Sequence, residues 1–133
     1  MTDTDDASTS SPLDPERLHE LLDSLGVDAT ELKDMVLLRY MNTVSEGFPV
    51  LASLLASKDA PGFRLKSHQL KGSSLNSGAM PLAAIFMGLE EMGKKGDLSQ
   101  AQPELDRAHL EFSRLRGYIE SGALMTVLAP KSA

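Results

Sequence analysis

Apolar residues recur at intervals of three and four along most of this chain, and this spacing constrains the fold more than any other feature. It places the apolar side chains on one face of an α-helix. The clearest example is the stripe formed by Leu18, Leu21, Leu22 and Leu25. The periodic part of the chain carries no strand signal of the alternating apolar and polar kind. The sequence therefore predicts an all-α fold.

Residues that typically begin and end helices divide the periodic part of the chain into five segments. Gly47 and Pro49 interrupt the second segment, and we expect a kink at Pro49 because proline removes a backbone hydrogen bond. Five helices with short connections predict an antiparallel four-helix bundle with an additional short N-terminal helix. The expected helices cover residues 14–26, 28–57, 59–78, 81–96 and about 99–121.

The length of 133 residues suits one domain, for which we expect three parts. Residues 1–12 are rich in Asp, Ser and Thr and predict a disordered acidic tail. Residues 13–122 would form the bundle. Residues 123–133 are apolar and then polar, so they would either extend the last helix or form a tail, and the sequence leaves both alternatives open.

The charge and composition exclude several classes of protein. The formal net charge is −6, whereas a protein that binds nucleic acid over much of its surface needs a positive one. No apolar run reaches the roughly 18 residues of a membrane span, and the acidic N-terminus lacks the features of a signal peptide. The absence of cysteine excludes disulfides and thiolate metal sites. We therefore expect a cytoplasmic protein that binds neither nucleic acid nor membrane.

The stretch "LKSHQLKGSSLNSG", residues 65–78, contains an isolated histidine in a segment that otherwise reads as a helix. Each residue turns a helix by about 100°, which places His68 about 140° from the centre of the predicted core face. Its imidazole should therefore face solvent. The residues expected on the core face are Phe63, Ser67, Leu70 and Ser74, and those expected beside His68 are Arg64, Lys71, Gly72 and Leu75.

The glycine in this helix needs an explanation. Glycine in a helix interior costs about 0.5–1 kcal/mol relative to alanine. Gly72 is easier to understand if a second surface must approach the helix beside His68. The alternative is a solvated helix face with an incidental histidine. We interpret the other two histidines, His19 and His109, as ordinary surface or rim residues, and we expect no metal site.

The segment that begins at Ser67 and ends at Asp97 resembles the histidine-containing phosphotransfer (Hpt) domain. The resemblance extends over roughly residues 14–121. It implies a four-helix bundle with an extra N-terminal helix, in agreement with the helical periodicity. The matching residues are His68, Leu70-Lys71-Gly72-Ser73-Ser74, Gly78 and Leu89-Glu90.

The resemblance implies a phosphorelay intermediate. His68 would accept a phosphoryl group from a receiver-domain aspartate, or from a kinase, and pass it to another receiver aspartate. Lys71 would lie beside the phosphoryl group, with Glu90 and Lys94 near the imidazole. The receiver would dock on Arg64, Gly72 and Leu75.

The partners implied are response-regulator receiver domains and a hybrid sensor histidine kinase. The chain itself would be a monomer without ATP-dependent kinase activity. It would need no cofactor, because the Mg²⁺ of the reaction is expected on the partner receiver domain. A basic patch of Arg64, Lys66, Lys71, Lys94 and Lys95 would attract the acidic pocket of a receiver.

Two departures from the family pattern affect these expectations. Ser67 stands where the family usually has alanine, and it is small enough to pack. Gly93 could shorten the helix expected at residues 81–96, in which case Lys94 and Lys95 would be loop residues. An alternative function is a protein-interaction bundle that docks receivers or kinases without transferring phosphate.

Overall fold

The periodic segments of the sequence form helices throughout the part of the chain that the computed structural model describes, residues 11–129. No strand occurs in that part. The helices, in chain order, are α1 (Pro15–Leu25), α2 (Ala29–Leu32), the π-helical turn η2 (Lys33–Leu37), α3 (Leu38–Ala56), α4 (Ala60–Asn76), α5 (Met80–Lys95), α6 (Ala101–Glu120) and α7 (Ala123–Leu128).

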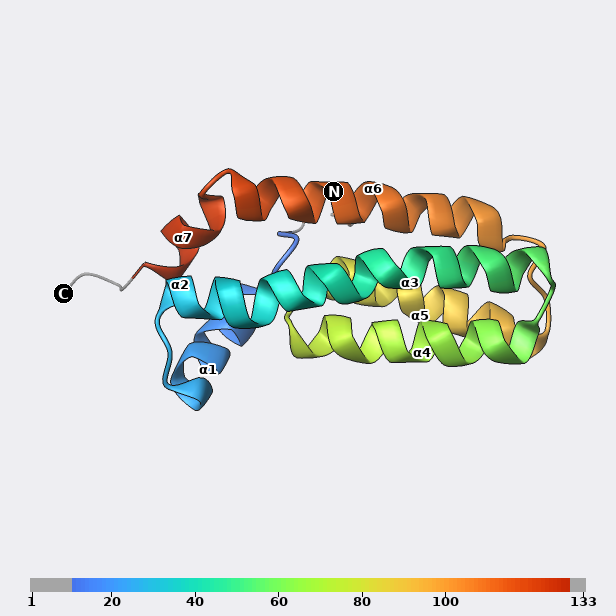
Figure 1. Cartoon of the computed structure of the whole chain (residues 1–133), viewed down its shortest axis with the longest axis horizontal. Coiled ribbons are helices and arrows are strands. Elements are labelled where there is room, and N and C mark those ends of the chain that lie inside the picture. The colour runs from blue at the N-terminus through green and yellow to red at the C-terminus, as the bar shows by residue number, and fades with distance from the viewer. Residues whose placement is uncertain (1–10, 130–133) are drawn as a thin grey trace, which may run out of the picture.

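The four long helices α3, α4, α5 and α6 lie side by side as an antiparallel bundle, and the shorter helices gather at one end of it (Figure 1). Short loops join each long helix to the next, so that neighbours in the sequence are neighbours in the bundle. The predicted all-α four-helix bundle with an additional short N-terminal helix is confirmed. None of the described helices is both long enough and apolar enough to cross a membrane.

Aspartate side chains cap the N-termini of three of the helices. The Asp14 carboxylate accepts a hydrogen bond from the backbone N–H of Glu16 at the start of α1. Asp28 and Glu31 form a capping box at the start of α2, with hydrogen bonds of 2.9 and 3.0 Å. Asp59 accepts from the N–H of Gly62 in α4. These bonds satisfy backbone donors that a helix leaves unpaired at its N-terminus.

The helix α3 continues through both Gly47 and Pro49, in agreement with the single helix expected over residues 28–57. Gly47 serves packing: a Cβ at this position would lie 2.8 Å from Cδ1 of Leu70, so the absence of a side chain lets α4 approach α3. The π-helical turn η2, which leads into α3, was not predicted from the sequence. The kink at Pro49 stays a prediction.

The structure describes only part of each end of the chain. Residues 1–10 of the predicted acidic tail, and residues 130–133 at the C-terminus, lie outside the described residues. Pro12 is buried. After Gly122, residues 123–128 form the separate helix α7, which packs against α1 and α2.

The core lies between the long helices and is built mainly from leucine and phenylalanine, with Phe63 and Phe86 among its largest fully buried side chains. The hydroxyls of Tyr40 and Ser74 form a buried hydrogen bond of 2.5 Å. Ser74 also donates to the Leu70 carbonyl within α4. The bond between Tyr40 and Ser74 joins α3 to α4 by a polar contact within the core. Burial raises the pKa of the Tyr40 phenol, which keeps the group neutral.

Ser67 is also buried, but its hydroxyl has no hydrogen-bond partner among the described residues. A buried polar group without a partner costs about 1–3 kcal/mol. We therefore expect Ser67→Ala to raise the free energy of unfolding by about 1 kcal/mol in urea titrations. Ser74→Ala is the matched control, and it should lower that free energy because the Ser74 hydroxyl is hydrogen-bonded. Destabilisation by Ser67→Ala would contradict this interpretation.

Candidate functional site

The central histidine of the site, His68, lies midway along α4 with 57% of its side chain exposed. The four residues predicted to face the core, Phe63, Ser67, Leu70 and Ser74, are buried. The helical periodicity of the sequence thus predicted correctly which way the histidine points.

A carboxylate on the neighbouring helix holds the ring. Nδ1 of His68 lies 2.8 Å from Oε2 of Glu90, which follows it by 22 residues. The antiparallel packing of α5 on α4 brings the two residues together. Nζ of Lys71, one turn after His68, lies 2.7 Å from the other carboxylate oxygen of Glu90. Glu90 is 8% exposed, so a buried carboxylate links the imidazole and the ammonium group.

The charge of Glu90 determines which ring nitrogen can react. The hydrogen bond from Lys71 lowers the pKa of the Glu90 carboxyl, burial opposes this, and the hydrogen bond with His68 lowers the pKa further. Glu90 is therefore ionised at neutral pH and can only accept hydrogen bonds. Nδ1 must then carry the proton of the neutral imidazole, and the ring's free lone pair is on Nε2.

The lowered pKa of Glu90 predicts a pH dependence of stability. A carboxyl whose pKa is depressed by folding stabilises the folded state above its unfolded pKa, near 4.5, and this contribution is lost as the pH falls through the folded value. We expect the wild type to lose stability more steeply than Glu90→Gln below about pH 4.5, as measured by urea unfolding at a series of pH values. Parallel pH profiles for the two proteins would contradict the assignment.

Gly93 does not shorten α5, which continues to Lys95. A Cβ at Gly93 would lie 2.8 Å from the backbone N and Cα of Arg64, so this glycine permits close contact between α5 and α4. Lys94 and Lys95 consequently lie in the last helical turn and not in a loop. Gly93 is therefore explained by sterics, because the contact between α4 and α5 leaves no room for a side chain at residue 93.

Among the described residues, Lys94 makes no contact with His68 or Glu90 and pairs with Glu91 instead. Its Nζ lies 3.4 Å from a carboxylate oxygen of Glu91, and both side chains are exposed. Exposed ion pairs of this kind contribute little to stability. The structure thus assembles His68, Lys71 and Glu90, whereas Lys94 has a different partner.

The exposed surface around His68 combines positive charge, apolar side chains and open space. Arg64 and Leu75 are exposed, and a Cβ at Gly72 would meet nothing within 4 Å. The sequence interpretation missed two exposed apolar residues, Leu65 on α4 and Met87 on α5. Both could have been found from helix geometry, because Leu65 lies three residues before His68 and Met87 three before Glu90.

The other two histidines lie elsewhere. His109 stacks on Phe48 at a centroid distance of 3.9 Å, and His19 lies on α1. No cluster of His, Asp or Glu among residues 11–129 has the arrangement of a metal site.

Comparisons with known proteins found a family and a solved structure that are similar to this chain. The family model of the Hpt domain matches residues 35–118. The crystal structure of histidine-containing phosphotransfer protein B (HptB) from Pseudomonas aeruginosa PAO1 is similar to this chain, with a TM-score of 0.76 and 26% sequence identity. The similarity covers 85% of this chain and 95% of that one. No curated protein matches the chain.

Proposed function

This chain belongs to the Hpt domain family, whose members are phosphorelay carriers and not kinases, and on that premise we propose that His68 carries the phosphoryl group. The observation that carries the proposal is the exposed imidazole whose Nδ1 is bound by the buried carboxylate of Glu90. This arrangement leaves the lone pair of Nε2 on the solvent side of a fixed ring.

The phosphoryl group would come from the aspartyl phosphate of a receiver domain. Nε2 of His68 attacks the phosphorus atom, a nitrogen–phosphorus bond forms, and the receiver's carboxylate leaves with the electron pair of the broken phosphorus–oxygen bond. The ring becomes an imidazolium, with its Nδ1 proton still hydrogen-bonded to Glu90. The negative charge of Glu90 stabilises this cation. The reverse sequence returns the group to the aspartate of a second receiver.

Positive charge beside the histidine favours the phosphorylated state. The Lys71 ammonium has three N–H donors, and the contact with Glu90 needs only one of them. We infer that a remaining donor of Lys71 binds a phosphoryl oxygen. The receiver domain would supply both the reacting aspartate and the Mg²⁺ that supports the transfer.

A receiver would dock on the face of α4 that carries His68. Gly72 supports this because none of residues 11–129 lies within 4 Å of its Cβ position in a way that would require a glycine, and its lack of a side chain keeps the surface beside His68 low. The exposed side chains of Leu65, Leu75 and Met87 offer apolar contact. Arg64 and the other cations of the basic patch would attract an acidic receiver.

The test is transfer from a receiver that has been charged with labelled acetyl phosphate. Wild type should take up an acid-labile label, and Gly72→Glu should slow transfer by about 100-fold, because it adds bulk and repels the acidic receiver. Gly117→Glu is the matched control: Gly117 lies inside α6, with nothing within 4 Å of its Cβ position. It should leave the rate within about twofold of wild type. Equal transfer by both variants would exclude the proposed docking face.

A further inference from the structure

A groove of about 1010 Å³ opens between α1, α2 and α7. These short helices lie at one end of the bundle (Figure 1). Its apolar lining comes from all three helices and includes Leu22, Ala29, Met125 and Leu128. A groove with apolar lining on three helices can bury the apolar side of a fourth element.

The acidic residues of the groove share one face of α1. Glu16, Glu20 and Asp23 recur at helical spacing and line the groove, and Asp28 adds a carboxylate at the start of α2. Among residues 11–129, the groove lining contains no lysine or arginine. These carboxylates do not form a metal site, since the described residues hold no suitable cluster. The rim is therefore strongly negative around an apolar floor.

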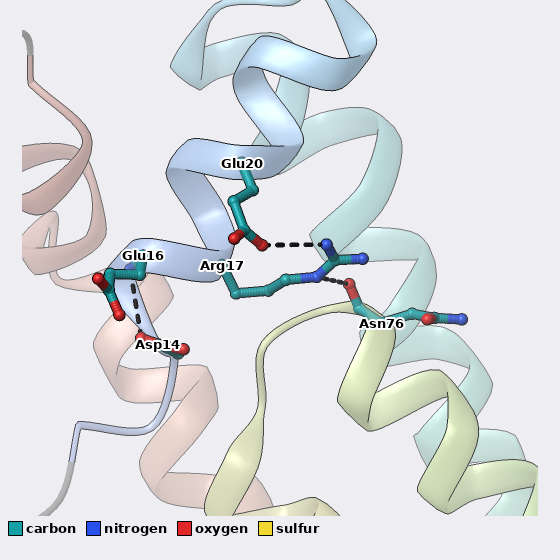
Figure 2. A network of polar contacts seen from close by, with 5 residues as sticks. All are labelled: Asp14, Glu16, Arg17, Glu20 and Asn76. Carbon is teal, nitrogen blue, oxygen red and sulfur yellow. Dashed lines mark hydrogen bonds and ion pairs between the residues drawn. The ribbon is translucent and has the colours of Figure 1, made fainter.

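The groove is separate from the face that carries His68. The Arg17 guanidinium donates to the backbone carbonyl of Asn76 at 3.2 Å and contacts Glu20 at 3.3 Å, so it holds α1 against the C-terminal end of α4 (Figure 2). Asn76 follows His68 by eight residues, which is about 12 Å along the helix. A partner in the groove can thus bind without covering the imidazole.

We propose that this groove binds a cationic amphipathic helix of a partner protein. The apolar stripe of such a helix would contact the floor, and its lysine or arginine side chains would face the carboxylates of α1. The acidic rim would repel nucleic acid and anionic membranes. It would also repel the chain's own residues 1–10, which contain three aspartates and no lysine or arginine.

The probe for this proposal is a synthetic peptide of about 14 leucine and lysine residues, patterned as an amphipathic helix. Its affinity for the full chain is measured by calorimetry, and the bound site is located from amide chemical shifts. The peptide should bind the wild type and perturb α1, α2 and α7. The same peptide with glutamate in place of lysine should not bind.

Two matched variants test the charge. Glu16→Gln/Asp23→Asn neutralises two exposed carboxylates of the groove and keeps Asp28, which caps α2. Glu46→Gln/Asp106→Asn neutralises two exposed carboxylates on α3 and α6. The groove variant should raise the Kd of the peptide at least about tenfold, and the control should change it less than about twofold. Met125→Lys tests the floor and should abolish binding, with circular dichroism to verify folding.

Several results would overturn the proposal. One is equal weakening by the two double variants, because attraction to an acidic protein in general would then explain the binding. Absence of peptide binding, or shifts confined to the surroundings of His68, would also reject it. A dimer in sedimentation experiments that the groove variant dissociates would show that the groove binds a second copy of this chain instead.

Discussion

His68→Gln should reduce the acid-labile label taken from a charged receiver to background. Glutamine occupies a similar volume and is polar, so the exposed position on α4 should tolerate it. It has no ring nitrogen with a free lone pair, and no phosphoramidate can form. The measurement is transfer from a receiver charged with labelled acetyl phosphate, followed by a comparison of acid and alkaline stability of the label.

The matched control is His109→Gln, which removes a histidine that stacks on Phe48 away from the cluster of His68, Lys71 and Glu90. This variant should be labelled like wild type. Labelling of His68→Gln would reject His68 as the acceptor. A wild type that binds receivers but takes no label would support the alternative function, an interaction bundle without transfer.

Gly93→Ala should lower the free energy of unfolding by about 2 kcal/mol, the largest loss of stability that we expect from one added methyl group. The new Cβ would lie 2.8 Å from backbone atoms of Arg64, which cannot move aside as a flexible side chain can. The helices α4 and α5 would have to separate where they now touch. The measurement is urea denaturation at neutral pH, followed by circular dichroism.

Gly72→Ala is the matched comparison, because it adds the same methyl group to the helix that packs against α5. Nothing lies within 4 Å of that Cβ position, so the higher helix propensity of alanine should raise the free energy of unfolding by up to about 1 kcal/mol. The two substitutions should therefore change stability in opposite directions. Equal effects would refute the distinction between a glycine that serves packing and one that leaves space for a partner.

Local chemistry explains why much of the fold could be predicted from the sequence. The caps at Asp14, Asp28 and Asp59 depend on residues a few positions away, and so the spacing of the sequence reveals them. The exposure of His68 depends only on the pitch of one helix. Periodicity alone therefore placed the histidine on the surface, opposite the buried Leu70.

Contacts between helices could not be predicted in this way. The pairing of Glu90 with His68 requires the register of α5 on α4, and only the resemblance to a family indicated it. The same register places Gly93 against the backbone of Arg64. From helix propensity alone, this glycine indicated a helix end. Lys94 shows that a role implied by the family cannot always be assigned from sequence position, because its contact is with Glu91 and not with the imidazole.

The hydrogen bond between Glu90 and Nδ1 of His68 has a consequence for the chemical identity of the product. Histidine can be phosphorylated on either ring nitrogen, which yields two regioisomers of different reactivity. Because Nδ1 carries a proton toward a buried carboxylate, only Nε2 is open to an incoming phosphorus atom. In the proposed transfer to His68, the fold would thus select one regioisomer before any partner arrives, and every receiver would meet the same phosphohistidine.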